Sequence, residues 1–179
     1  MNIAIIGLGQ SCPKEKPKGI DIAIGVNDAP DWCDAIVVVD PPRVFNKERL
    51  DTIVNHFGKL YTNDDEWSKL RQAEIFKLAA KRHDMFYVGT NTIVQSFTSI
   101  IPAIGVAAWE YQFQPIYLYG VDLINHHALS DPAKTAIIAK NLKDLAKRIP
   151  LYFGAIDKYS PIIGCLPLRS PESQSELIS

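Results

Sequence analysis

Sulfur is scarce in this 179-residue chain, and long apolar runs are missing. The three cysteines, Cys12, Cys33 and Cys165, form no CxxC pair and no zinc-ligand spacing, so the sequence predicts no metal site and favours buried or idle thiols. The longest apolar-leaning stretch, residues 100–109, is too short to span a bilayer. A strand pattern begins within the first three residues and leaves no room for a signal peptide, so we expect a cytoplasmic protein.

Neither sign of charge is in excess. Lys and Arg number 19 against 20 Asp and Glu, and the formal net charge of −1 gives no general attraction to nucleic acid or to a membrane surface. Lys14, Lys16 and Lys18 lie close together and could form a local basic patch. We predict one domain over residues 1–168, which is long enough to bury a core, followed by a flexible serine-rich tail over residues 169–179.

Several short apolar runs end in small or polar residues. Residues 3–6, 22–24, 35–39 and 116–119 lack polar alternation, which is typical of strands buried on both faces of a parallel sheet. Further short strands are expected at residues 59–62, 85–88 and 150–153. The sequence therefore predicts a three-layer α/β fold with a Rossmann-like, open and mainly parallel sheet.

Apolar spacing predicts helices over residues 47–57, 66–81, 98–113 and 131–148, whereas residues 93–97 are ambiguous between helix and strand. Asn46 is the expected N-cap of the first of these helices. Two prolines and a glycine make a full crossover helix over residues 12–19 unfavourable.

Polar side chains follow four of the predicted strands. Ser11, Asn27, Asp40 and Asp122 each come after a buried-type strand. Parallel α/β sheets bind ligands outside the carboxyl ends of their strands, so we expect these four residues at one edge. Asn and Asp suit contacts to a ribose or a base edge, although both are also favoured in turns.

The first predicted strand runs into the glycine-rich segment 7–11, Gly-Leu-Gly-Gln-Ser. Gly7 and Gly9 would let a phosphate approach the backbone, and free N–H groups there could line an anion nest. The match to the GxGxxG dinucleotide motif is partial, because Cys12 takes the third glycine position and no helix is expected to follow. We therefore favour a phosphate or nucleotide contact other than a Rossmann NAD site, with a plain tight turn as the alternative.

A histidine pair follows the strand at residues 116–119. His126 or His127 could act as a general base near neutral pH, because histidine titrates in that range. Adjacent histidines do not share a helix face, so a metal pair of the HExxH type is not expected. A solvated loop is the alternative interpretation.

The order of these features resembles the family 42 sialyltransferases and the related motility-accessory-factor glycosyltransferases. The shared features are the loop at residues 7–11, Asn27 after the second strand, the turn at residues 40–42, Thr98-Ser99 before a small-residue helix, and an IYLxGxD segment at residues 116–122 followed by a histidine. Gln10 replaces a proline of the family loop, and Asp40 stands where the sialyltransferases usually have asparagine.

The resemblance implies a nucleotide-binding, nucleotide-sugar-dependent glycosyltransferase-like enzyme with no permanently bound cofactor. In those families the loop, the asparagine and the threonine-serine turn hold the nucleotide of the sugar donor, and a histidine serves as base. The implied catalytic residue is His127 or His126, and the implied nucleotide-binding residues are Gly7, Gly9, Gln10, Ser11, Asn27, Asp40, Thr98, Ser99 and Asp122.

Two further hypotheses come from other functional classes. A pterin-type pyrophosphokinase, which is known on a similar core, would use ATP with Mg²⁺ held by Asp40 or Asp122, because Mg²⁺ favours carboxylate oxygen. A non-catalytic nucleotide-binding or assembly module would keep the pocket without turnover. Trp109, Tyr111 and Phe113 are expected either in the core or on the face of a homo-oligomer.

Overall fold

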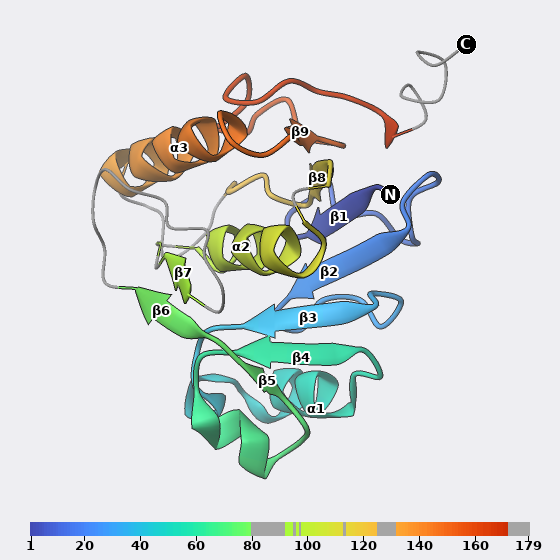
Figure 1. Cartoon of the computed structure of the whole chain (residues 1–179), viewed down its shortest axis with the longest axis vertical. Coiled ribbons are helices and arrows are strands. Elements are labelled where there is room, and N and C mark those ends of the chain that lie inside the picture. The colour runs from blue at the N-terminus through green and yellow to red at the C-terminus, as the bar shows by residue number, and fades with distance from the viewer. Residues whose placement is uncertain (80–91, 95, 97, 113, 125–131, 172–179) are drawn as a thin grey trace.

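The computed structural model describes residues 1–79, 92–94, 96, 98–112, 114–124 and 132–171 (Figure 1). Its main element is a seven-stranded, all-parallel sheet in the order β5-β4-β3-β2-β1-β8-β9. These strands are β1 (Ile3–Ile6), β2 (Ile22–Val26), β3 (Ala35–Val38), β4 (Lys59–Thr62), β5 (Glu74–Ile75), β8 (Ile116–Tyr119) and β9 (Leu151–Phe153). The other described elements are the parallel pair β6 (Lys77–Ala79) and β7 (Thr92–Val94), the α-helices α1 (Lys47–Asn55), α2 (Ile100–Glu110) and α3 (Pro132–Ala146), and the 3₁₀ helices η1 (Pro42–Val44) and η2 (Asp65–Lys69).

Strand β1 marks the point where the chain changes direction across the sheet. β2, β3, β4 and β5 follow one another on one side of β1, whereas β8 and β9 lie on the other side. Ile3 of β1 is opposite both Ile22 of β2 and Ile116 of β8. A reversal of strand order of this kind leaves a crevice at the carboxyl ends of the strands, where open α/β sheets bind ligands.

Helices cover both faces of the sheet and give three layers (Figure 1). Ile3 and Ile5 belong to a core shared with α2 and α3, whereas Ala4 and Ile6 belong to a second core on the α1 side. All four of these side chains are completely buried. Burial on both faces explains why the strand segments lack polar alternation. The predicted α/β class with an open parallel sheet is confirmed.

The predicted helices at residues 47–57, 98–113 and 131–148 correspond to α1, α2 and α3. The ambiguous stretch from residue 93 begins within strand β7, residues 12–19 contain no helix, and the predicted strand at residues 85–88 lies outside the described residues. Trp109 and Tyr111 are partly buried against the α2 core, whereas Phe113 is outside the described residues. Within the described part of the chain, no helix is both long enough and apolar enough to cross a membrane.

The predicted helix over residues 66–81 is wrong. Of the described residues 65–79, only residues 65–69 are helical, as the 3₁₀ helix η2, and the chain then continues into β5 and β6. Contacts with residues distant in sequence, and not the helical spacing of the apolar residues, decide the structure of this segment. Trp67 is completely buried and donates its indole N–H to the carbonyl of Asp40 at 2.9 Å, while the N–H of Phe76 donates to the carbonyl of Thr62 at 2.8 Å and extends the pairing with β4.

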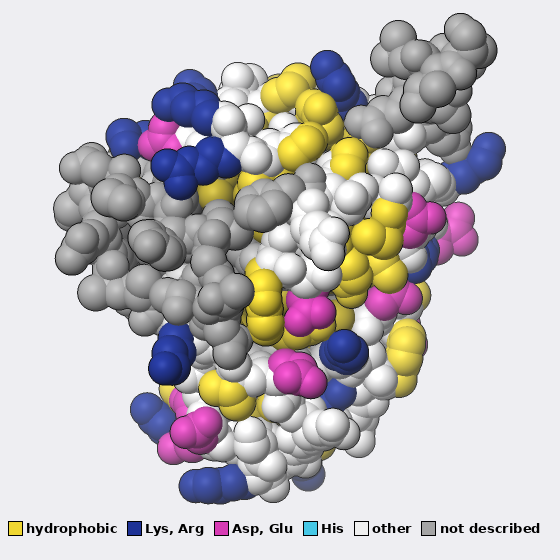
Figure 2. Space-filling view, viewed as in Figure 1, with side chains coloured by type: hydrophobic (Ala, Val, Ile, Leu, Met, Phe, Trp, Pro, Cys, Tyr) yellow, Lys and Arg dark blue, Asp and Glu magenta, His cyan; other side chains and the backbone are white. Residues whose placement is uncertain are grey.

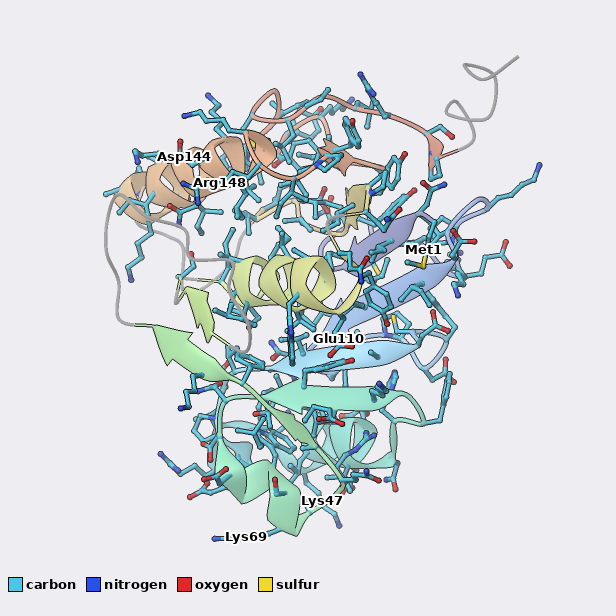
Figure 3. All side chains as sticks on the ribbon, in the orientation of Figure 1. Met1, Lys47, Lys69, Glu110, Asp144 and Arg148 are labelled. Atoms are coloured by element: carbon cyan, nitrogen blue, oxygen red, sulfur yellow. The ribbon has the colours of Figure 1, made fainter. Side chains whose placement is uncertain are left out.

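Figure 2 shows several Lys and Arg side chains over α3, and other charged side chains of both signs are spread over the rest of the face that it shows. Asp144, labelled in Figure 3, pairs with Lys140 of the same helix at 3.0 Å and with Lys147, just after the helix, at 2.7 Å. Hydrogen bonds from Lys147 and Lys140 lower the pKa of Asp144. Surface pairs of this kind contribute little to stability, because water screens both partners.

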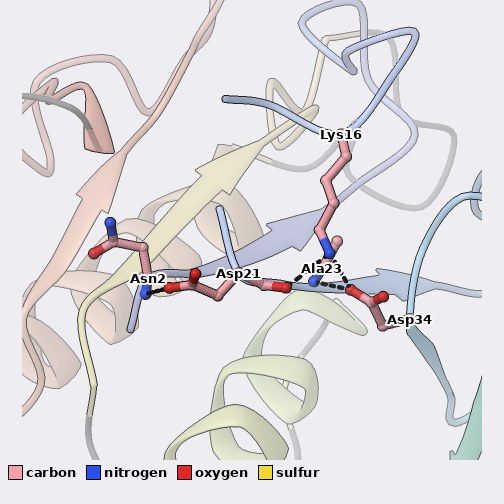
Figure 4. A network of polar contacts seen from close by, with 5 residues as sticks. All are labelled: Asn2, Lys16, Asp21, Ala23 and Asp34. Atoms are coloured by element: carbon pink, nitrogen blue, oxygen red, sulfur yellow. Dashed lines mark hydrogen bonds and ion pairs between the residues drawn. The ribbon is translucent and has the colours of Figure 1, made fainter. Parts of the chain in front are cut away.

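Lys16, one of the three lysines that could form a local basic patch, is paired at the amino ends of the strands (Figure 4). Its ammonium donates to the carbonyl of Asp21 at 2.7 Å and to Asp34 Oδ2 at 2.8 Å. The same carboxylate oxygen accepts the N–H of Ala23 at 2.8 Å, and Asn2 N donates to Asp21 Oδ2 at 2.7 Å. This network joins the loop after β1 to the starts of β2 and β3, opposite the carboxyl edge.

The first helix, α1, is capped at both ends by side chains. Asn46 Oδ1 accepts the N–H of Arg49 at 3.0 Å, as predicted. At the other end, the guanidinium of Arg71 donates to the carbonyls of Ile53 at 2.9 Å, His56 at 2.7 Å and Gly58 at 2.5 Å. Arg71 therefore satisfies carbonyls that have no partner within the helix.

His56 gives the fold an acid-sensitive point. Its ring is 6% exposed, Nδ1 accepts the N–H of Gly58 at 3.0 Å, and Nε2 lies 3.3 Å from the carbonyl of Pro30. This arrangement suits a neutral imidazole with the proton on Nε2, because protonated Nδ1 could not accept. Burial, with a smaller contribution from nearby Arg71, lowers the pKa of His56 below its usual 6.5.

We expect the free energy of unfolding to fall as pH drops below about 6.5, because the unfolded chain then binds a proton that folded His56 binds less well. The fall should continue to the lowered pKa of the folded state. His56→Asn keeps an acceptor for the Gly58 N–H and removes the titration. Urea midpoints at about pH 7.5 and about pH 5.5 should therefore differ less in the variant, and equal differences in both proteins would contradict the assignment.

Candidate functional site

A pocket of about 570 Å³ opens at the carboxyl ends of β1, β2, β3 and β8, beside the start of α2. It lies at the point where the strand order reverses, as the general rule for open sheets predicts. Its lining combines apolar side chains with a few polar ones, the usual make-up of a small-molecule site. The lining residues are Gly7, Leu8, Gly9, Val26, Asn27, Val39, Asp40, Arg49, Ser96, Thr98, Ser99, Ile100, Gly120, Val121, Leu123 and Ile124.

The four polar residues expected at one edge do follow neighbouring parallel strands, β1, β2, β3 and β8. The structure divides them into two groups. Asn27 and Asp40 line the pocket, together with Gly7, Gly9, Thr98 and Ser99 from the predicted set. Ser11, Gln10 and Asp122 are not among its lining residues, and His126 and His127 lie outside the described residues.

Asp122 clamps three chain segments together behind the pocket. It is completely buried, its Oδ2 accepts the N–H of Ser11 at 2.6 Å, and its Oδ1 accepts the Ser11 hydroxyl and the N–H of Asp157, both at 2.7 Å. The N–H of Gly120 donates to the same hydroxyl at 3.0 Å. These bonds occupy both carboxylate oxygens and join the loops after β1, β8 and β9, so Ser11 and Asp122 position the pocket walls.

The loop glycines are required by the backbone of the neighbouring strand end. Gly7 N donates to Tyr119 O and Gly9 N to Gly120 O, both at 2.7 Å. A Cβ added at Gly7 would overlap the carbonyl oxygen of Gly120, and one at Gly9 would lie 2.5 Å from Asp122 Oδ2. Close backbone approach therefore explains both glycines without a ligand.

The anion nest expected in this loop is smaller than the sequence suggested. The N–H groups of Gly7, Gly9 and Ser11 donate within the protein, as does that of Cys12, to Gly9 O at 3.0 Å. Within the described part of the chain, the N–H groups of residues 8 and 10 have no recorded protein acceptor. Of these two residues, Leu8 lines the pocket and Gln10 does not.

Cys12 does not have the character of a nucleophile. Burial, with a smaller effect of Asp122, raises the pKa of its thiol, and burial raises the pKa of Cys33 to about 12. A raised pKa keeps these thiols protonated at neutral pH, and the protonated form is a poor nucleophile and a poor metal ligand.

Asn27 is held in an uncommon conformation at the pocket wall. Its φ of 53° lies in the left-handed region, which asparagine tolerates better than most residues. Its N–H donates to Val37 O at 3.0 Å, and its buried Oδ1 has no hydrogen-bond partner in the described structure. Leu123, also in the wall, has a φ of 54°, which is costly for a leucine. Backbone strain of this kind clusters at functional sites.

The start of α2 brings hydroxyl groups and a positive helix end to the pocket. Thr98 Oγ1 accepts the N–H of Ile100 at 3.3 Å, whereas the Ser99 side chain makes no capping bond. Ser96 Oγ accepts from Asn141 of α3 at 3.2 Å. In the first turn, Pro102 has no N–H and that of Ala103 donates to Ser99 O at 3.0 Å, so the Ile101 N–H and the helix dipole are what make this end of an 11-residue helix favourable for an anion.

Arg49 and Ser96 are pocket residues that the sequence reasoning missed. Arg49 comes from the first turn of α1, which follows the Asp40 turn, and it reaches back to Asp28 after β2. Its signal in the sequence was a basic residue three positions after the Asn46 cap, in a helix that must start near the carboxyl end of β3.

Among the described residues, no group of three or more His, Cys, Asp and Glu side chains is placed to hold a metal ion. Comparisons with protein-family models, with curated proteins and with solved structures found no match to this chain. The fold class therefore rests on the structure alone, and the pocket is the basis for a functional class.

Proposed function

We propose that the pocket binds a nucleotide and that the protein is a glycosyltransferase-like enzyme using a nucleotide-sugar donor. The observation that carries the proposal is the polarity of the pocket. Hydroxyls and a helix N-terminus lie at one end, and Asn27 and Asp40 belong to the ends of β2 and β3. Phosphate oxygens suit the hydroxyls and helix end and also the guanidinium of Arg49 in the same lining, and ribose hydroxyls suit a carboxylate and an amide oxygen that has no partner.

The chemical step follows from the resemblance to the sialyltransferases. An acceptor hydroxyl attacks the anomeric carbon of the donor sugar, the new C–O bond forms, and the bond from that carbon to the phosphate oxygen breaks. The hydroxyl proton passes to His127 or His126, and the electron pair leaves with the phosphate. The N-terminus of α2 would stabilise the negative charge that develops on this leaving group.

The pyrophosphokinase alternative would have to rest on Asp40. Asp122 already accepts three hydrogen bonds and would lose them as a Mg²⁺ ligand. Asp40 is exposed and lines the pocket, so its carboxylate could take a cation together with the phosphates of ATP.

A thermal-shift panel of CMP, UDP, GDP, NAD and ATP with and without Mg²⁺ tests the proposal. A nucleotide at about 100 times its Kd should add about 2.7 kcal/mol to the free energy of unfolding, which is a rise of about 5–10 °C in Tm for a chain of this size. A response to ATP only with Mg²⁺ would favour the pyrophosphokinase. No response to any nucleotide would contradict nucleotide binding.

Ser99→Ala locates the bound nucleotide. The Ser99 side chain makes no capping bond, so its removal should leave Tm unchanged while weakening binding by about tenfold through loss of one hydrogen bond to phosphate. Ser68→Ala, an exposed serine in η2 outside the pocket, is the matched control. Equal affinities of the two variants would place the nucleotide elsewhere.

A further inference from the structure

The guanidinium of Arg49 is fixed on one edge and on one face. Its Nε and Nη2 both donate to Asp28 Oδ1, at 2.9 and 2.5 Å. The ring of Phe45 lies under the guanidinium, with the central carbon 5.0 Å from the ring centroid. Two independent contacts therefore hold a side chain that would otherwise be mobile, and they leave its orientation defined.

The terminal edge of this guanidinium, formed by Nη1 and Nη2, has donors that Asp28 does not use. Asp28 accepts the N–H of Nε and one N–H of Nη2, and the N–H groups of Nη1 and the second of Nη2 have no partner among the described residues. The side chain is 41% exposed and lines the pocket. Parallel N–H groups in a fixed plane match the two oxygens of a phosphate or a carboxylate.

Arg49 is also the only Lys or Arg among the described lining residues of the pocket. Asp40 is the only acidic residue in that set, so the wall offers one cation and one anion from neighbouring elements. A ligand that satisfies both must carry an anionic group for Arg49 and a hydrogen-bond donor for Asp40. If Arg49 served only to form an ion pair with Asp28, it would not need to line a pocket.

We propose that Arg49 is a specificity-determining residue that selects ligands bearing an anionic phosphate or carboxylate group, which it grips with its free edge while Asp28 and Phe45 hold it in place. The inference rests on the proposed function for the identity of the ligand, a nucleotide. It goes beyond that function, because it assigns the choice between charged and uncharged ligands to one residue.

The experiment compares CMP with cytidine by calorimetry in wild type, Arg49→Gln and Lys47→Gln. Lys47 is exposed at the start of the same helix and is labelled in Figure 3, so its variant removes the same charge away from the pocket. Arg49→Gln should weaken CMP binding by about tenfold to a hundredfold and leave cytidine nearly unchanged, whereas Lys47→Gln should affect neither. Inorganic pyrophosphate and malonate, followed by NMR, distinguish a phosphate from a carboxylate as the preferred group.

The outcomes separate this inference from the proposed function. If CMP binds and Arg49→Gln keeps the wild-type ratio of CMP to cytidine affinity, Arg49 is not the selector, although nucleotide binding stands. If no nucleotide binds but pyrophosphate or malonate binds and is lost only in Arg49→Gln, the anion receptor stands and the nucleotide proposal fails. If no probe binds wild type, both are wrong.

Arg49→Lys is a second variant, in case Arg49→Gln fails to fold. Lysine keeps a positive charge for Asp28 but lacks the planar fork, so this variant should retain the wild-type Tm and still lose most of the preference for CMP over cytidine. An unchanged preference in a folded Arg49→Lys variant would overturn the bidentate contact.

Discussion

Replacing Asp122 with alanine is expected to lower the free energy of unfolding by about 3–5 kcal/mol, because buried donors lose a charged acceptor. The carboxylate is completely buried and accepts from Ser11 twice and from Asp157 once. Alanine leaves the two backbone N–H groups without a partner and leaves a cavity beside them. The loops that line the pocket should loosen together, so nucleotide affinity should fall with stability.

Urea unfolding of Asp122→Ala, with Asp144→Ala as control, measures this effect. Asp144 also has two partners, but they are the exposed side chains of Lys140 in α3 and Lys147 just after it, and exposed ion pairs add little. The Asp144 variant should therefore lose much less stability. Similar losses in the two variants would show that the buried clamp does not hold the carboxyl edge together.

The central strands were predictable because they are buried on both faces. β1, β3 and β8 consist entirely of buried residues, and their unbroken apolar runs stand out in the sequence. The rule that parallel strands share one carboxyl edge then placed the polar residues that follow them. These strands and the residues after them can be placed without knowledge of contacts between residues distant in sequence.

The helix expected over residues 66–81 shows where periodicity misleads. Leu70 and Ile75, two of its apolar positions, are 46% and 37% exposed and form no buried stripe. Trp67 instead packs into the core on the α1 side and bonds to Asp40, 27 residues earlier in the chain. The competing contacts are long-range, so a local pattern could not reveal them.

The position of the candidate site could be predicted from the sequence. The sequence could not tell which of its polar residues line the pocket and which hold its walls together. Asn27 and Asp122 both follow strands and look alike in the sequence. Only the structure separates them, because Asp157, which occupies Asp122, is 35 residues away, whereas Asn27 Oδ1 remains without a partner. Arg49 could not be predicted as a pocket residue for the same reason. It lines the pocket and pairs with Asp28, which lies in a separate turn of the chain.

Gly120→Ala is expected to lower the free energy of unfolding by about 3–5 kcal/mol, as the sum of a left-handed backbone penalty and a steric overlap. Gly120 has a φ of +65°, and a Cβ there would overlap the carbonyl oxygen of Gly7 and lie 3.0 Å from Cys12 Cβ. Neither neighbour can move freely, because Gly7 N is bonded to Tyr119 O and the loop is tied to Asp122 through Ser11.

Gly164→Ala is the control that separates the two contributions. Gly164 has a φ of +81°, but a Cβ there would meet nothing within 4 Å, so its variant should lose only the backbone part, about 1–2 kcal/mol. Differential scanning calorimetry of both variants gives the difference directly. If Gly120→Ala is no less stable than Gly164→Ala, the close approach of the loops after β1 and β8 does not constrain this edge. Contact with a bound phosphate, which the sequence favours, would then be the better explanation of Gly7 and Gly9.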